Sequence, residues 1–114
     1  MEGRQVYELQ AEVYKALSNP TRLMIIECIG TDRKSVAQIV DCLGLSKSNV
    51  SQHLNYMKAL GILCSQKEGK NVYYYLSDPA LLEALRSIRE ILFNRFVKCG
   101  QIMGAKAINL KLGS

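Results

Sequence analysis

The sequence lacks the features that mark membrane and secreted proteins. None of its apolar runs approaches the roughly 20 residues that a membrane-spanning helix needs, and its first residues lack the apolar core of a secretory signal. Its four cysteines include no CxxC pair. We therefore expect a cytoplasmic protein whose cysteines are reduced thiols and not a disulfide framework.

The features of an enzyme are missing as well. The chain has one histidine, His53, and it shows no glycine-rich phosphate loop, no catalytic pair of carboxylates and no cofactor motif. A cysteine nucleophile would need a base and an orienting group beside it. The sequence therefore predicts a protein that is not an enzyme and holds no cofactor.

What the chain does have is enough apolar content for one compact domain. It contains 114 residues, of which 48% are hydrophobic, and its formal net charge is +5. A chain of this length forms one core, and a moderate positive charge suits an anionic partner such as nucleic acid without requiring one. We expect one domain over residues 1–100 and a C-terminal tail over residues 101–114.

Two helices are predicted at the start of the chain. Apolar residues spaced three and four apart predict an amphipathic helix over residues 6–17. Asn19 is a natural N-cap and Pro20 a natural first-turn residue for a second helix that runs to about Gly30.

The next two predicted helices are separated by a very short turn. Ser35 caps a helix that Gly44 ends, and Ser46 caps a helix that Gly61 ends. Both glycines stand where the end of a helix favours a left-handed residue. Two helices around a tight, glycine-containing turn are the helix-turn-helix pattern.

The fourth predicted helix has the polar face of a DNA-recognition helix. The face opposite its apolar stripe is almost uncharged, whereas an inert solvated face usually carries Glu and Lys. Hydroxyl and amide groups donate and accept hydrogen bonds at base edges, and a lysine can meet guanine or phosphate. The candidate DNA-binding residues on this helix are Lys47, Ser48, Asn49, Ser51, Gln52 and Asn55.

After Gly61 the apolar period changes from helical to two. Residues 62–66 and 72–76 are predicted as two strands around a connecting segment over residues 67–71. A β-hairpin directly after a recognition helix is a wing, and Lys67 and Lys70 at its tip can reach phosphates or a minor groove. The alternative is an ordinary solvated turn.

A final long helix, capped by Asp78, is predicted to drive dimerisation. Its apolar stripe consists of Leu81, Leu85, Ile88, Leu92, Phe96 and Cys99. We expect a mainly α winged helix-turn-helix fold with a small β-hairpin, in helices–hairpin–helix order. One small core cannot bury this stripe together with the first helix. We therefore expect a two-fold homodimer through the first and last helices. Two recognition helices about 34–36 Å apart predict double-stranded DNA with an inverted-repeat operator as the partner.

These segments together resemble the ArsR/SmtB family of bacterial and archaeal repressors over residues from about 12 to 90. The matching pieces are ALSNPTRL at 16–23, LGLS at 43–46, VSQHL at 50–54, LGIL at 60–63 and GKNVYYYL at 69–76. Their order and spacing together are specific. The resemblance implies a winged-helix dimer that represses transcription until an inducer releases it from DNA.

The metal sites best known in this family are missing here. The positions that match its thiolate pair are Ser35 and Ala37, and its last helix needs Asp and His ligands where this chain offers Asp78 and Glu83 but no histidine. We therefore predict no metal site of either kind. His53 lies in the recognition helix, where the family often has histidine, and we expect a structural or DNA-contacting role for it.

The cysteines are the remaining candidates for sensing an inducer. Some members of the family sense persulfides or oxidants through one cysteine in the second helix and one in the last, and Cys28 and Cys99 resemble that pair. A bridge between the two helices would change the angle of the dimer and lower its DNA affinity. Cys42 is predicted to be partly exposed, and Cys64 is predicted to pack within a strand.

Three alternatives remain open at this point. Cys99 and another thiol could bind a soft metal such as arsenite or cadmium across the dimer. All the cysteines could be structural, because free cysteine usually behaves as a small buried hydrophobe. The winged fold could also bind a protein instead of DNA.

Overall fold

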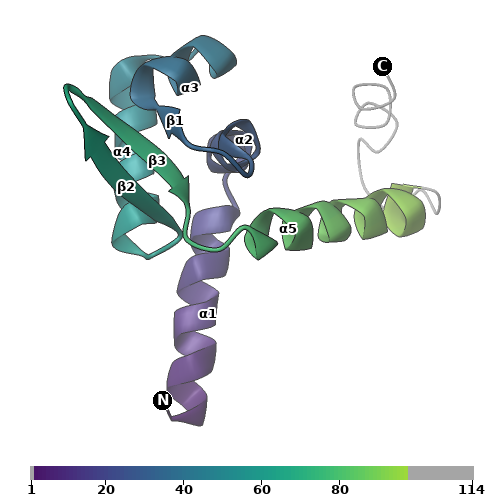
Figure 1. Ribbon diagram of the computed structural model, residues 1–114. Coiled ribbons are helices and arrows are strands. Elements are labelled where there is room, and N and C mark those ends of the chain that lie inside the picture. The colour runs from purple at the N-terminus through teal and green to yellow at the C-terminus, as the bar shows by residue number, and fades with distance from the viewer. Residues whose placement is uncertain (1, 98–114) are drawn as a thin grey trace. The chain divides into compact units, whose positions relative to one another are not determined.

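A computed structural model describes residues 2–97 (Figure 1). The chain divides into two compact units at the boundary between Pro79 and Ala80, and each unit is described by itself. The elements of the first unit are α1 (Gly3–Leu17), α2 (Pro20–Ile29), β1 (Lys34–Ser35), α3 (Val36–Leu43), α4 (Lys47–Ala59), β2 (Leu63–Glu68) and β3 (Asn71–Leu76). The described elements of the second unit are α5 (Ala80–Ile91) and the π-helix η1 (Leu92–Val97). The predicted order of helices, hairpin and helix is confirmed.

The predicted caps of the second helix are present. The Oδ1 atom of Asn19 accepts a hydrogen bond from the backbone N–H of Arg22 at 3.1 Å, and Pro20 is the first residue of α2. At the other end Gly30 has φ +62°. The Asn19 cap supplies a partner for one of the free N–H groups that every helix start leaves.

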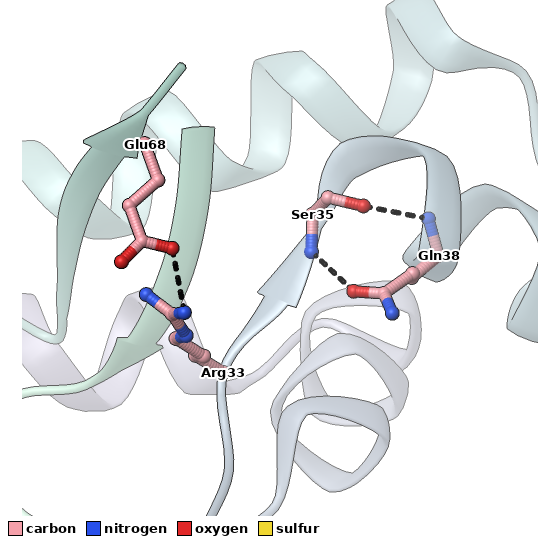
Figure 2. Close-up of polar contacts among 4 residues, drawn as sticks. All are labelled: Arg33, Ser35, Gln38 and Glu68. Atoms are coloured by element: carbon pink, nitrogen blue, oxygen red, sulfur yellow. Dashed lines mark hydrogen bonds and ion pairs between the residues drawn. The ribbon is translucent and has the colours of Figure 1, made fainter. Parts of the chain in front are cut away.

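The helix-turn-helix is also confirmed, and its serine caps fix both helix starts. Ser35 and Gln38 form a reciprocal pair, in which the N–H of Gln38 donates to the Ser35 hydroxyl at 3.2 Å and the N–H of Ser35 donates to the Gln38 amide oxygen at 2.9 Å (Figure 2). Ser46 accepts from the N–H of Asn49 at 3.1 Å. Gly44 adopts φ +69°, a left-handed conformation that strains residues with a Cβ. The turn into α4 depends on this glycine.

The sheet has one strand more than the sequence predicts. The short strand β1 pairs antiparallel with β3, which gives the order β1-β3-β2, with Lys34 opposite Tyr74. A strand of two residues is too short to show an alternating pattern, so nothing in the sequence distinguishes it from a turn. The hairpin lies alongside α4, and β2 packs against that helix (Figure 1).

The tip of the hairpin is tighter than predicted. The sequence predicts a connecting segment over residues 67–71, but Lys67 lies within β2 opposite Val72, and Glu68 pairs with Asn71. The loop is therefore two residues long and begins with a glycine, Gly69, at φ +61°. A positive φ at the first of two loop residues is what a type II′ hairpin turn needs.

The core of the first unit forms where α2, α3, α4 and the sheet meet. Ala16 at the end of α1 is fully buried, and the largest fully buried side chains come from α2, α3, α4 and β2. These residues are Ile25, Ile26, Ile29, Ile39, Val50, Leu54, Met57 and Leu63. Their burial holds the inner face of α4 against the rest of the unit.

One polar side chain connects three helices of this unit. The guanidinium of Arg22 in α2 donates to the carbonyl oxygen of Ala16 in α1 at 3.1 Å and to Nδ1 of His53 in α4 at 3.1 Å. It also lies over the ring of Tyr56, 4.3 Å from the ring centroid. Because Nδ1 of His53 accepts this hydrogen bond, the imidazole is neutral with its proton on Nε2.

The last helix is shorter and less regular than predicted. The α-helical part ends at Ile91, and a π-helix covers residues 92–97. The wider turn of a π-helix changes which residues share a face, so the three-and-four spacing does not define one continuous stripe here. Cys99 and the predicted tail over residues 101–114 lie outside the described residues. Within residues 2–97, no helix has both the length and the apolar character to cross a membrane.

We expect the Arg22→Lys substitution to lower the free energy of unfolding by about 1–3 kcal/mol, because a single ammonium cannot replace the planar fork that serves two acceptors. Urea denaturation at fixed protein concentration measures this. The matched control is Arg4→Lys, since Arg4 is 90% exposed and pairs with Glu8 on its own helix. The control should change stability by less than about 0.5 kcal/mol. An equal effect of both substitutions would contradict the structural role of Arg22.

We also expect the stability of the protein to fall as the pH falls below about 6.5. Burial, and then the charge of Arg22, lower the pKa of His53 from its ordinary value of 6.5. The unfolded chain therefore binds a proton at a higher pH than the folded chain, and the free energy of unfolding decreases through that window until the folded-state pKa is passed.

The comparison is with His53→Gln, which keeps an amide acceptor for Arg22 but does not titrate. Since His53 is the sole histidine of the chain, the variant should show a flatter dependence of stability on pH between about 6.5 and 5. Identical pH profiles for the two proteins would show that this contact does not control their acid sensitivity.

Candidate nucleic-acid interface

The outer face of α4 carries the residues predicted to contact DNA. The exposed residues among them are Lys47, Ser48, Asn49, Gln52 and Asn55, and Ser51 is half-buried. The opposite face is buried through Val50, Leu54 and Met57. No Asp or Glu occurs anywhere in α4, so the outer face offers amides, hydroxyls and a lysine without a carboxylate that would repel phosphate.

His53 and Tyr56 of α4 are engaged with α2. Both are half-buried, and both contact Arg22. The hydrogen bond from Arg22 to Nδ1 gives His53 a structural role, which is one of the two roles predicted for it. Sequence reasoning missed Arg22 and Tyr56, and the one available signal was that Arg22 falls in the first segment of the family resemblance.

The wing presents two exposed lysines, at different places. Lys70 is in the two-residue loop at the tip, and Lys67 is in β2, further from the tip than predicted. Between them Glu68 is held by Arg33, whose Nη2 atom lies 2.7 Å from the Glu68 carboxylate (Figure 2). The Arg33 guanidinium also lies 4.4 Å from the centroid of the Tyr73 ring. These contacts join the wing to the segment before β1. They also neutralise the Glu68 carboxylate, which lies between Lys67 and Lys70 in the sequence.

A cavity of about 460 Å³ lies between the start of α3, the start of α4 and the wing. Its lining residues are Ser35, Val36, Ala37, Val40, Asp41, Lys47, Lys70, Asn71 and Val72. Lys47 and Lys70, which were predicted from separate segments, line the same cavity. Lys67 is not among the lining residues. No sequence pattern pointed to Asn71 or Asp41. The fold therefore places a cation of α4 and a cation of the wing around the same space.

The described cysteines lie in different surroundings. Cys42 is exposed, Cys28 and Cys64 are half-buried, and all three are free thiols. Burial is the largest cause that raises the pKa of Cys28 to about 11, and the neighbouring Cys42 side chain is the next. The neighbour that the described residues provide for Cys28 is thus Cys42, while Cys99, its predicted partner, lies outside them. No three His, Cys, Asp or Glu side chains between residues 2 and 97 lie close enough together to hold a metal ion.

Comparison with protein families and with known proteins gives a consistent result. The family described as "Bacterial regulatory protein, arsR family" matches residues 19–65. An HTH-type transcriptional regulator of Methanocaldococcus jannaschii, itself uncharacterized, is 36% identical over 86 residues, which cover 75% of this chain and 97% of the relative. This relative and one from Mycobacterium tuberculosis are both named HTH-type transcriptional regulators, in agreement with the prediction of a protein that is not an enzyme.

Solved structures share the fold. Reduced HlyU from Vibrio cholerae is 30% identical with a TM-score of 0.69, over 75% of this chain and 93% of that one. Rv0081 of Mycobacterium tuberculosis is 30% identical with a TM-score of 0.69, over 81% and 91%. A domain of Mb0332 from Mycobacterium bovis, described as a homodimeric winged helix-turn-helix DNA-binding domain, has a TM-score of 0.72 at 23% identity, over 80% and 92%. The chain belongs to the ArsR family of winged helix-turn-helix transcriptional regulators.

Proposed function

We propose that this regulator is a homodimeric repressor that binds double-stranded DNA sequence-specifically at an inverted-repeat operator and leaves it when an inducer acts. The observation that carries the proposal is the carboxylate-free polar outer face of α4 beside a wing with two exposed lysines. In a helix-turn-helix protein the second helix enters the major groove. Residues Lys47, Ser48, Asn49, Ser51, Gln52 and Asn55 are therefore the proposed contacts to DNA.

The residues of α4 divide into two proposed tasks. Asn and Gln can form paired hydrogen bonds with the N6 and N7 groups of adenine, and each such pair discriminates against a wrong base by about 1–3 kcal/mol. Gln52 and Asn55 are the proposed sequence readers. Lys47, at the first position of α4, is a phosphate or guanine contact, and the serines contact bases or backbone.

The wing supplies the proposed backbone contacts. Lys70 and Lys47 line the same cavity, so one stretch of sugar-phosphate backbone running past it would meet both charges. Lys67 lies further along β2 and can contact a neighbouring phosphate. Phosphate contacts fix the register of the protein on the duplex, and base contacts supply the sequence preference.

The exposed apolar side chains support the proposed dimer. On α1, Val6, Leu9 and Tyr14 are 43%, 50% and 59% exposed. On the described part of the second unit, Ile88 and Ile91 are 55% and 59% exposed. Apolar surface of this kind favours association, and a two-fold axis would give the paired recognition helices that an inverted repeat requires.

The proposed inducer is a thiol-reactive signal, an oxidant or a persulfide, with Cys28 and Cys99 as the pair suggested by the family resemblance. The second candidate is a soft metal bound by thiolates. It is favoured by one relative, named the cadmium resistance transcriptional regulatory protein CadC of Listeria innocua, which is 34% identical over 73 residues. Release of DNA by oxidant alone or by cadmium alone distinguishes the two.

The test of the proposed function is binding of the reduced protein to the promoter DNA of its own operon, followed by fluorescence anisotropy over a salt series. If Lys47 and Lys70 of both protomers each neutralise one phosphate, affinity should fall about 100-fold between about 50 and 200 mM salt. A winged fold that binds a protein through apolar surface would show little salt dependence and no preference for this DNA.

Single substitutions should separate sequence reading from backbone contact. Asn55→Ala should weaken binding to the operator by about 5-fold to 150-fold for each protomer that loses its contact, and it should leave binding to unrelated DNA almost unchanged. Lys70→Gln should weaken both, and it should reduce the slope of log affinity against log salt by about one for each phosphate that the lysine no longer neutralises.

The matched control is Lys58→Gln, since Lys58 is exposed in the last turn of the same helix and is not among the proposed contacts to DNA. It should bind operator like the unmodified protein. If the Lys58→Gln change were as damaging as Lys70→Gln, the effect would come from net charge and not from the wing.

A further inference from the structure

Two cysteines from successive helices lie next to each other in the first unit. Cys28 is in the last turn of α2, and Cys42 is in the last turn of α3. The two helices pack together, and the Cys42 side chain is close enough to the Cys28 thiol to raise its pKa. Both are free thiols, Cys28 half-buried and Cys42 exposed.

We propose that Cys28 and Cys42 form a dithiol that a peroxide oxidises to a reversible disulfide between α2 and α3, and that this bond lowers the affinity for DNA. The effect on DNA rests on the function proposed above, whereas the formation of the bond does not. This pair lies within one unit and needs neither Cys99 nor the last helix.

The difference in exposure assigns the order of the two reactions. Cys42 is open to solvent, so a peroxide reaches its sulfur first. Cys28 is protonated at neutral pH, because burial and the neighbouring Cys42 raise its pKa to about 11. A protonated, half-buried thiol reacts slowly with peroxide. Cys28 is therefore the resolving cysteine.

The chemistry balances with a peroxide as the oxidant. Hydrogen peroxide oxidises the Cys42 thiol to a sulfenic acid, and one water is released. The sulfur of Cys28 then attacks the sulfur of the sulfenic acid, the S–S bond forms, the S–O bond breaks, and the hydroxyl leaves with the Cys28 proton as a second water. The two thiols together give up two electrons, and the peroxide gains them.

Oxidation of Cys42 makes the following attack by Cys28 easier. Two of the causes that raise the pKa of Cys28 come from Cys42, namely its hydrogen bond and its charge. Oxidation to a sulfenic acid replaces the Cys42 thiol, from which both of these causes arise. Lys34 remains close, with its Nζ donating to the carbonyl oxygen of Cys28 at 2.9 Å, and its charge lowers the same pKa.

A bond at this place acts on the recognition helix through the turn that precedes it. An S–S bond is about 2.05 Å long, much shorter than the contact between two separate thiols, and we expect its formation to draw the end of α3 toward α2. Gly44 follows Cys42 by two residues and opens the turn into α4. A displacement there changes the direction of α4 relative to the wing, and both must meet the same DNA.

Two neighbouring sulfurs suit this oxidation better than they suit a metal ion. Structural zinc and related soft ions take four ligands from Cys, His or carboxylates. Among the described residues no third side chain of that kind joins the two thiols in a group that could hold a metal. The pair alone provides what a disulfide needs, which is two thiols in reach of each other.

The test uses a full-length chain that carries Cys64→Ser and Cys99→Ser, so that Cys28 and Cys42 are the two cysteines left of four. After treatment with one equivalent of hydrogen peroxide, peptide mass spectrometry should find a bond between peptides containing Cys28 and Cys42. Dithiothreitol should reverse it. Affinity for the promoter DNA should fall by about 5-fold or more on oxidation and return on reduction.

The matched variants separate the roles of the two thiols. Cys42→Ser should bind DNA normally and show no response to peroxide. Cys28→Ser should accumulate a sulfenic acid at Cys42 that dimedone traps. Cys64→Ser alone should respond like the unmodified protein, since Cys64 lies on β2 with its sulfur 3.4 Å from the Ser77 hydroxyl.

Three results would overturn the proposal. The first is the absence of a bond in the two-cysteine chain. The second is a bond between Cys28 and Cys99 in the unmodified protein. The third is a bond between Cys28 and Cys42 that leaves DNA affinity unchanged. If the reduced protein binds no DNA at all, the proposed function fails, and the mapped bond still decides whether the dithiol exists.

Discussion

The position of the recognition helix depends on the guanidinium of Arg22. The apolar face of α4 is buried through Val50, Leu54 and Met57, but apolar contact is not directional and would tolerate small rotations of the helix. The hydrogen bond from Arg22 to His53 and the stacking over Tyr56 act on two successive turns of α4. They are directional contacts, and they fix the rotation of α4 that turns its amide and hydroxyl side chains outward.

The same guanidinium links α4, with its proposed DNA-binding face, to the proposed dimer interface. Its third partner is the carbonyl oxygen of Ala16, in the last turn of α1, and α1 also carries the exposed apolar residues proposed to face a second copy. A change in the direction of α1 would therefore act on α4 through one part-buried polar contact as well as through packing. Such a contact has two discrete states, made or broken, which suits the proposed alternation between DNA binding and release.

Local rules predicted most of this fold, and long-range contacts account for what they missed. Asn19, Ser35, Ser46 and Gly44 mark helix ends because capping depends on neighbours within a few residues. The strand β1 has two residues and no alternation to detect, and its existence depends on β3, far along the chain. The contact between Arg22 and His53 joins residues 31 positions apart. No periodicity reports such a pair, although each member stands in a segment of the family resemblance.

Local sequence patterns also fail to predict which cysteines lie close together. Sequence reasoning placed the partner of Cys28 by resemblance, in the last helix, because the spacing from Cys28 to Cys42 carries no helical or strand period. The helices α2 and α3 pack together, and the Cys42 side chain is close enough to the Cys28 thiol to raise its pKa. Because Cys42 stands two residues before Gly44, a chemical change there acts on the helix-turn-helix itself. In the proposed function, a signal at that point would reach the outer face of α4 without first passing through the proposed dimer interface, so it would act even if that interface did not change.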